Sequence, residues 1–277
     1  MIARVREALS AAAVTTGDIA WIDAGDAADL AVEGEMATAR AVLAQVDGLD
    51  FVVRAGERRK ARLFVADMDS TIIGQECIDE LADYAGFKEE VAAITERAMQ
   101  GELDFASALT QRVALLKGLD AKTLAKCRRA RIRPNPGAAT LVTTMKAQGA
   151  LTVLVSGGFT DFVRPIGLQL GFDRMRANAL AVEGGNLTGS TVGAIVDGAA
   201  KRRLADEILA GMNATPEELV AIGDGANDAP MIELAGVGIG YRPKPALARV
   251  ADGLIRFHHL TAVLWMQGIA RRDWVLA

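Results

Sequence analysis

Four short, almost uninterrupted apolar runs constrain what this 277-residue chain can fold into. They lie at residues 63–66, 151–155, 219–222 and 237–239, with Gly or Asp close to their ends and helical patterns between them. Runs of this length are typical of strands that are buried on both faces of a parallel sheet. The core is therefore expected to be a doubly wound α/β sheet, whose reactive groups collect beyond the carboxyl ends of the strands.

The segments around these runs predict smaller attachments to the core. Residues 72–133 have helical periodicity and no strand-like run, which predicts a helical cap inserted after the first strand. Residues 177–192 alternate and turn at a Gly-Gly-Asn sequence, which predicts a β-hairpin flap. Residues 1–60 read as helix, strand, strand, helix and strand, a small α+β module. The expected division is therefore this module and a second domain at 61–277.

Composition narrows the class of partner. The chain has 35 acidic and 31 basic residues, a formal charge of −4, which argues against a nucleic-acid or anionic-lipid partner. Its two cysteines, Cys77 and Cys127, have the spacing of neither a disulfide framework nor a zinc site. The apolar stretches are too short to span a membrane. A soluble cytoplasmic protein with a small-molecule substrate is expected.

Two aspartates directly follow the first apolar run. Asp67 and Asp69 are separated by one residue in the motif Asp-Met-Asp-Ser-Thr. Like charges this close raise each other's cost of ionisation, so the pair favours a bound cation. Mg²⁺ takes oxygen ligands and would let a carboxylate attack phosphorus without repulsion from the phosphate. A turn cap is the alternative that this motif alone leaves open.

Two further strand ends carry groups that suit phosphate and metal. In the sequence Gly-Asp-Gly-Ala-Asn-Asp, Asp224 and Asp228 offer more hard oxygen acceptors. Ser156 and Gly157 provide a hydroxyl and a glycine amide, which can hold phosphate oxygens where they lead into a helix. Lys201, at the start of an expected helix, could supply a positive charge, although a surface position explains a single lysine there more simply.

Together, Asp-Met-Asp-Ser-Thr, Ser-Gly-Gly-Phe, Lys201 and Gly-Asp-Gly-Ala-Asn-Asp resemble the four motifs of the haloacid dehalogenase superfamily in order and spacing. Residues 76–80 and 105–116 resemble the substrate-recognition segments of its phosphoserine phosphatase family. The resemblance runs from about residue 63 to residue 251, and Met68 departs from it because the family usually has phenylalanine there. It implies a Rossmann-like core, a Mg²⁺ cofactor and hydrolysis of O-phospho-L-serine through an aspartyl-phosphate intermediate, the last step of serine biosynthesis.

The resemblance also implies a role for each matching residue. Asp67 is the expected nucleophile, and Asp69 is the expected general acid and base. Metal ligands are expected to be Asp67, the carbonyl of Asp69, and Asp224. The substrate-binding set is expected to comprise Ser156, Gly157, Lys201 and Asn227 for the phosphate, Glu76 for the ammonium group and Arg112 for the carboxylate. The supporting set is Asp228, which would orient Lys201 or the metal's waters, and Met99 and Phe105, which would shield the site or simply pack inside the cap.

Several alternatives stay open at this stage. The enzyme could act on another small phosphomonoester, or transfer the phosphoryl group to an alcohol. It could instead be a non-catalytic metabolite sensor, in which the module at 1–60 binds the signal. That module resembles a shortened ACT-type regulatory module, and its ligand is not readable from the sequence. A homodimer is compatible with all of these readings.

Overall fold

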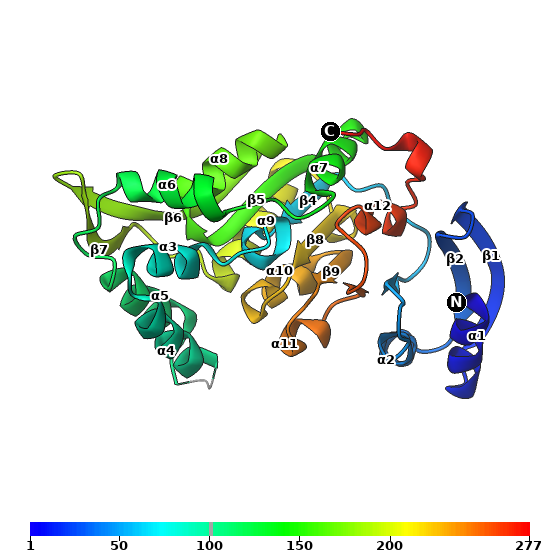
Figure 1. Ribbon diagram of the computed structural model, residues 1–277. Coiled ribbons are helices and arrows are strands. Elements are labelled where there is room, and N and C mark those ends of the chain that lie inside the picture. The colour runs from blue at the N-terminus through cyan, green and yellow to red at the C-terminus, as the bar shows by residue number, and fades with distance from the viewer. Residues whose placement is uncertain (100–101) are drawn as a thin grey trace.

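The structure is a computed structural model that describes residues 1–99 and 102–277. Its centre is an eight-stranded sheet in the order β3-β10-β9-β8-β4-β5-β6-β7, whose central strands cross the middle of Figure 1. The strands are β3 (Phe51–Val52), β4 (Leu63–Ala66), β5 (Leu151–Phe159), β6 (Arg174–Glu183), β7 (Asn186–Val192), β8 (Leu219–Gly223), β9 (Val237–Tyr241) and β10 (Gly253–Ile255). The pairs from β10 to β6 are parallel, and only the outer pairs with β3 and β7 are antiparallel. The doubly wound sheet predicted from the apolar runs is confirmed.

The register of the central strands aligns their carboxyl ends. Ala66 of β4 pairs with Leu154 of β5 on one side and with Ile222 of β8 on the other. The polar residues that follow these three strands therefore emerge at one edge of the sheet. This alignment brings together motifs that lie far apart in the sequence.

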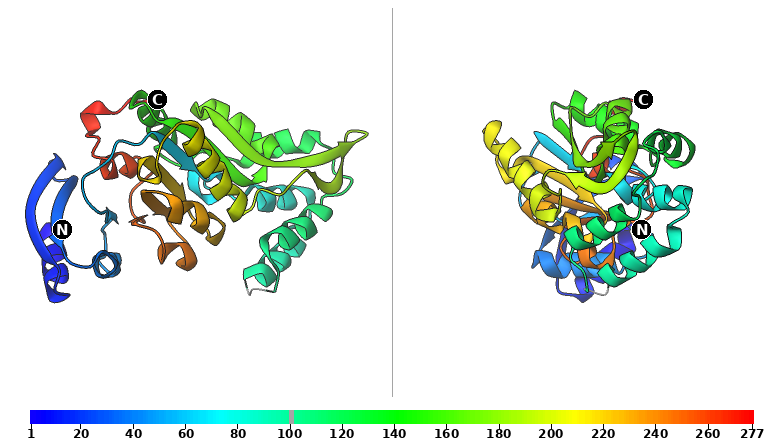
Figure 2. Two further views of the ribbon diagram at one scale, coloured as in Figure 1. Left: turned by 180° about the vertical axis from the view of Figure 1, so that it is seen from behind. Right: turned by 90° about the vertical axis from the view of Figure 1, so that its left-hand side faces the viewer.

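Helices cover both faces of the sheet, because its strands are apolar on both sides (Figure 2). One face packs against α7 (Ala138–Ala147), α8 (Thr160–Leu170) and α12 (Ala262–Met266). The other face packs against α9 (Gly198–Gly211), α10 (Ala229–Leu234) and α11 (Pro245–Ala248). Successive side chains of β4 point to opposite faces of the sheet. Phe64 packs in the core under α7, α8 and α12, and Val65 packs in the core under α9, α10 and α11.

The long segment between β4 and β5 is helical, as its periodicity predicts. It contains α3 (Cys77–Ala85), α4 (Lys88–Met99), α5 (Phe105–Ala114) and α6 (Lys122–Arg131), and an isolated bridge between Ile73 and Pro134 closes its base.

The hairpin β6–β7 turns at Gly184 and Gly185, both with positive φ, and it is joined to the helical segment. Gly118 N donates to Leu187 O, and Leu187 N donates to Leu119 O, each at 2.8 Å.

The first elements of the chain form α1 (Ile2–Ala11), β1 (Thr15–Asp23), β2 (Ala27–Glu33) and α2 (Met36–Ala44). β1 and β2 make a separate two-stranded antiparallel sheet, at the opposite end of the molecule from α4 in Figure 1. The last strand expected in this module, β3, instead pairs with β10 at the edge of the large sheet. Among the described residues, no helix is both long and apolar enough to cross a bilayer.

Candidate active site

Asp67 is the first residue after β4, and it is almost completely buried at 3% exposure. Its backbone N–H donates to the carbonyl of Ile222 at 3.0 Å, which fixes the start of the loop against β8. Ser70, three residues later, adopts a positive φ of 55°. This unusual backbone turn, in a residue other than glycine, returns the chain toward the sheet edge and starts the helical cap.

Lys201 joins two of the strand-end motifs through a pair of short ionic contacts. Its side chain is fully buried, and Nζ donates to Asp67 Oδ1 at 2.5 Å and to Asp228 Oδ1 at 2.6 Å. Lys201 lies in the first turn of α9, which begins after Asp197, whose carboxylate accepts from the N–H of Ala200 at 2.7 Å. The surface position that a lysine alone would suggest is therefore excluded.

The charges in this buried cluster perturb one another. Burial lowers the pKa of Lys201, but the carboxylates of Asp228 and Asp67 outweigh it and raise that pKa above its usual value. Burial and the neighbouring Asp228 raise the pKa of Asp67 well above its usual range, against the opposing effect of Lys201. Two buried carboxylates share one ammonium group, so the cluster has an excess of negative charge that a cation would relieve.

Asp67, Asp224 and Asp228 each place a carboxylate oxygen within 4.8 Å of the others. The carboxylate of Asp228 is already occupied, since Oδ1 accepts from Lys201 and Oδ2 accepts from the N–H groups of Asp224 and Gly225, both at 3.1 Å. Asp67 and Asp224 therefore have more free oxygen lone pairs to offer. An all-oxygen donor set with surplus negative charge fits a hard divalent cation such as Mg²⁺.

Asp69 faces a different neighbour. Its Oδ2 accepts from the Ser156 hydroxyl at 2.7 Å, and its Oδ1 accepts from the N–H of Cys77 at 2.8 Å. The Ser156 hydroxyl in turn accepts from the N–H of Gly158 at 2.8 Å. A Cβ on Gly158 would lie 2.8 Å from Asp69 Oδ2, so only glycine fits beside this carboxylate.

Gly157 lies directly beneath the ring of Phe105, the first residue of α5. A Cβ on Gly157 would stand 2.5 Å from Phe105 Cζ, so the absence of a side chain lets the cap close over the loop. The carbonyl of Gly157 accepts from Asn178 Nδ2 at 2.8 Å, and Asn178 Oδ1 accepts from the N–H of Val196. Asn178 was not found from the sequence, because a single asparagine inside a strand has no pattern.

Glu76 and Arg112 approach the same region from the cap. Glu76 Oε1 accepts from the Ser70 hydroxyl at 2.7 Å, and burial, followed by the charge of Asp69, raises the pKa of Glu76 to about 7. Burial lowers the pKa of Arg112, whereas the charges of Asp79 and Glu76 oppose that shift. Arg112 is thus close enough to both carboxylates to interact with them. Asp79, which the sequence analysis did not assign to the site, keeps a buried Oδ1 without a hydrogen-bond partner among the described residues.

Lys244 is a further charged residue that the sequence analysis missed. Its Nζ lies 3.1 Å from Asp224 Oδ2 and 3.9 Å from Glu76 Oε1. Its backbone N–H donates to the carbonyl of Asp224 at 2.8 Å. Lys244 follows β9 at the same sheet edge, and that position after an apolar run is the signal that could have identified it.

The remaining expected residues have less defined places. Asn227 is partly buried, and its Oδ1 lies only 2.4 Å from where a Cβ on Gly225 would be. It belongs to the same loop as Asp224 and Asp228. Met99 is the last residue of α4, but its side chain lies outside the described part of the structure.

Comparison with known proteins agrees with this geometry. The family model of haloacid dehalogenase-like hydrolases matches residues 64–233. The chain belongs to this family. The matched range includes every motif that contributes to the acidic cluster. Lys244 lies beyond its end.

The relatives of this haloacid dehalogenase-like hydrolase include several phosphoserine phosphatases. That of Streptomyces coelicolor is 44% identical over 253 residues, which are 89% of this chain and 62% of the relative. That of Idiomarina loihiensis is 44% identical over 207 residues, 75% of this chain and 94% of the relative. The chain thus spans under two thirds of the Streptomyces protein, and likewise only 63% of the relative from Archaeoglobus fulgidus.

Solved structures lead to the same family. A probable phosphoserine phosphatase from Vibrio cholerae is 32% identical with a TM-score of 0.75, and the match covers 97% of this chain and 84% of that one. A phospho-aspartyl intermediate analogue of phosphoserine phosphatase is 39% identical with a TM-score of 0.70, and the match covers 74% of this chain and 98% of that one.

Proposed function

We propose that this chain is a Mg²⁺-dependent phosphoserine phosphatase, which hydrolyses O-phospho-L-serine to L-serine and phosphate. The observation that carries the proposal is the buried contact of Lys201 with both Asp67 and Asp228, beside the Asp69–Ser156 pair and beneath a cap that presents Glu76. Relatives named phosphoserine phosphatases, 44% identical over most of this chain, support the choice of substrate.

The first chemical step is assigned to Asp67. A carboxylate oxygen of Asp67 attacks phosphorus as the bond between phosphorus and the serine oxygen breaks. Asp69 gives its proton to the departing serine oxygen. Lys201, which already donates to Asp67, neutralises charge on the phosphoryl oxygens as the aspartyl phosphate forms.

The second step returns Asp67 to its free form. A water molecule attacks phosphorus, Asp69 accepts the proton of that water, and the bond between Asp67 and phosphorus breaks. Ser156 and the amide of Gly157 hold the phosphoryl oxygens in both steps, while Asn227 helps to position the phosphate. Bound Mg²⁺, held by Asp67, Asp224 and the carbonyl of Asp69, would supply positive charge that offsets repulsion between carboxylate and phosphate.

Substrate recognition is assigned to the cap. Glu76 suits the ammonium group of phosphoserine, and the fork-shaped guanidinium of Arg112 suits its carboxylate. Phe105 shields the phosphate loop from water by covering Gly157. These assignments account for two opposite charges in the cap that the phosphoryl chemistry itself does not need.

The chain is further proposed to consist of an ACT-like module at 1–60 and a phosphatase domain at 61–277, and to work in the cytoplasm. The free buried thiols of Cys77 and Cys127 support a reducing compartment. The Vibrio cholerae structure matches 97% of the chain, which supports a shared arrangement that includes the first 60 residues.

The test is phosphate release from phosphoserine with Mg²⁺, run beside phosphothreonine, glycerol phosphate and p-nitrophenyl phosphate. We expect steady turnover with the highest kcat/KM on phosphoserine, and none after chelation of the metal. Faster turnover of another phosphomonoester would reassign the substrate. A lack of turnover on all four compounds would favour the alternative that this chain is a non-catalytic metabolite sensor.

A further inference from the structure

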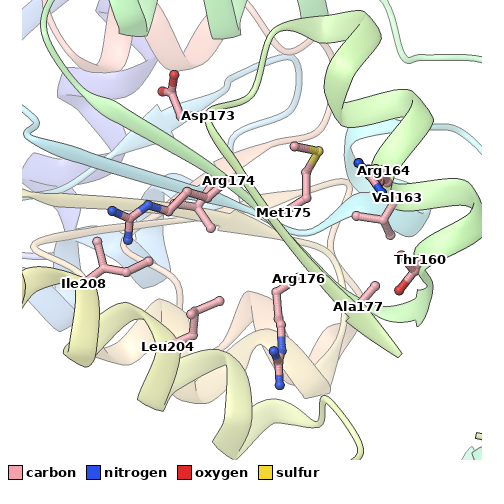
Figure 3. A pocket seen from close by; sticks show the side chains of 11 residues that line it. Thr160, Val163, Arg164, Asp173, Arg174, Met175, Arg176, Ala177, Leu204 and Ile208 are labelled. Atoms are coloured by element: carbon pink, nitrogen blue, oxygen red, sulfur yellow. The ribbon is translucent and has the colours of Figure 1, made fainter. Parts of the chain in front are cut away.

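A groove of about 580 Å³ lies beside the first residues of β6, and none of its lining residues belongs to the acidic cluster. Figure 3 shows β6 passing between α8 on one side and α9 on the other. β5 pairs with β6 between residues 174 and 178, whereas β7 pairs with β6 only from Ala179 onward. The start of β6 therefore has an open outer edge in the described part of the chain.

An open strand edge offers backbone hydrogen bonds to any segment that can align with it. Along a strand, backbone N–H and C=O groups alternate between its two edges, so β5 can satisfy only part of those at 174–177. No other backbone group of the described chain bonds to these residues. The free groups can pair with an added strand, as in complexes that form by β-strand addition.

Three arginines surround this edge: Arg164, Arg174 and Arg176. In Figure 3, Arg174 and Arg176 project toward α9, and Arg164 stands on α8 across the strand. No side chain of the three forms a hydrogen bond or ion pair with a described residue. The one acidic residue of the groove, Asp173, is already engaged by Lys146 at 2.7 Å and by Thr152. The groove is thus positively charged on a protein whose formal net charge is −4.

The walls of the groove are apolar. Met175 and Val163 form the side toward α8, and Leu204 and Ile208 form the side toward α9. Charged residues on an edge strand can also serve only to prevent unspecific pairing with other chains. That role would explain the arginines, but it requires no apolar walls beside them. Because Arg174 and Arg176 are two residues apart on the same side of the strand, an extended ligand with carboxylates at alternate positions can meet both.

We propose that this groove binds an extended acidic segment of a partner protein, which adds a strand to β6 and pairs its carboxylates with Arg174 and Arg176. Main-chain hydrogen bonds to 174–177 would align the segment, and the apolar side chains on its other face would lie against Met175 and Val163. The arginines would favour segments that carry acidic side chains at the positions facing them.

The test uses a fluorescent octapeptide that alternates glutamate and valine, titrated with the full chain and followed by anisotropy. We expect saturable binding of one peptide per chain that weakens at high salt. The double variant Arg174→Glu/Arg176→Glu should weaken it at least tenfold, whereas the control Arg4→Glu/Arg249→Glu, with the same charge change on other exposed positions, should bind within twofold of the wild type.

Two further peptides decide between strand addition and simple charge attraction. The same octapeptide N-methylated at alternate residues keeps its charge and loses the ladder, so it should bind at least tenfold more weakly. A lysine-valine octapeptide should not bind. Equal binding of the methylated peptide, full displacement by inorganic pyrophosphate, or no saturable binding at all would overturn the proposal. So would a change of oligomeric state in Arg174→Glu/Arg176→Glu, which would make a second copy of this chain the occupant.

Discussion

Removal of the Lys201 ammonium should destabilise the protein far more than removal of an exposed lysine. Lys201 is fully buried and holds Asp67 and Asp228 at 2.5 and 2.6 Å. Lys201→Met keeps most of the apolar stem but leaves two buried carboxylates without their cation. Breaking a buried ion pair by removing one partner costs on the order of 3–5 kcal/mol. We expect the free energy of unfolding to fall by about this amount at neutral pH in the absence of metal.

Urea denaturation with a chelator present measures this loss, and Lys244→Met is the matched control. Lys244 also contacts an active-site carboxylate, Asp224 at 3.1 Å, but its side chain is 56% exposed. An ion pair this exposed is worth about 1 kcal/mol or less, so the control should change little. Similar losses for the two variants would contradict the buried ion-pair network.

The pH dependence of that loss provides a second check. Burial and the charge of Asp228 raise the pKa of Asp67 in the folded state, and Lys201, which opposes that shift, is lost in the variant. A carboxyl group with a raised folded pKa destabilises the fold as pH rises above the unfolded pKa, and less as pH falls. The deficit of Lys201→Met should therefore shrink between about pH 7 and about pH 5. A deficit that stays constant over this interval would show that lost packing, rather than charge, is the cause.

Three other variants test separate parts of the site. Asp69→Asn should lower kcat by ~10²–10⁴-fold with folding intact, because it removes a general acid and base; a loss under tenfold would move that role elsewhere. Arg112→Ala should lower kcat/KM for phosphoserine by an amount equivalent to about 2–4 kcal/mol and change kcat/KM for p-nitrophenyl phosphate little. Equal losses on both substrates would indicate a structural role. Glu76 has a pKa of about 7, so KM for phosphoserine should rise as pH falls through that value, and Glu76→Gln should abolish this dependence.

Much of the fold was predictable because burial on both sides of a sheet leaves a visible trace in the sequence. The runs at 63–66 and 219–222 match β4 and β8 closely, and their polar successors meet as expected. The partner of β3 was not predictable. Its pairing with β10 joins a two-residue strand to a segment about 200 residues away, and no local periodicity encodes such a partner.

The site was predictable where a motif follows a strand end, and unpredictable where one polar residue acts alone. Asp79, Asn178 and Lys244 each depend on contacts between segments that meet only in the folded chain. Their types carry no spacing rule, so only the structure shows which polar residue faces the cluster.

The central claim is that Asp67 carries the phosphoryl group during turnover. The most direct measurement is acid quenching of the enzyme during turnover of phosphoserine with Mg²⁺, followed by mass spectrometry of its peptides. The account predicts a phosphoryl group on the peptide that contains Asp67, lost on brief treatment with hydroxylamine and absent from Asp67→Asn. Turnover without this adduct, or full activity in Asp67→Asn, would contradict the account.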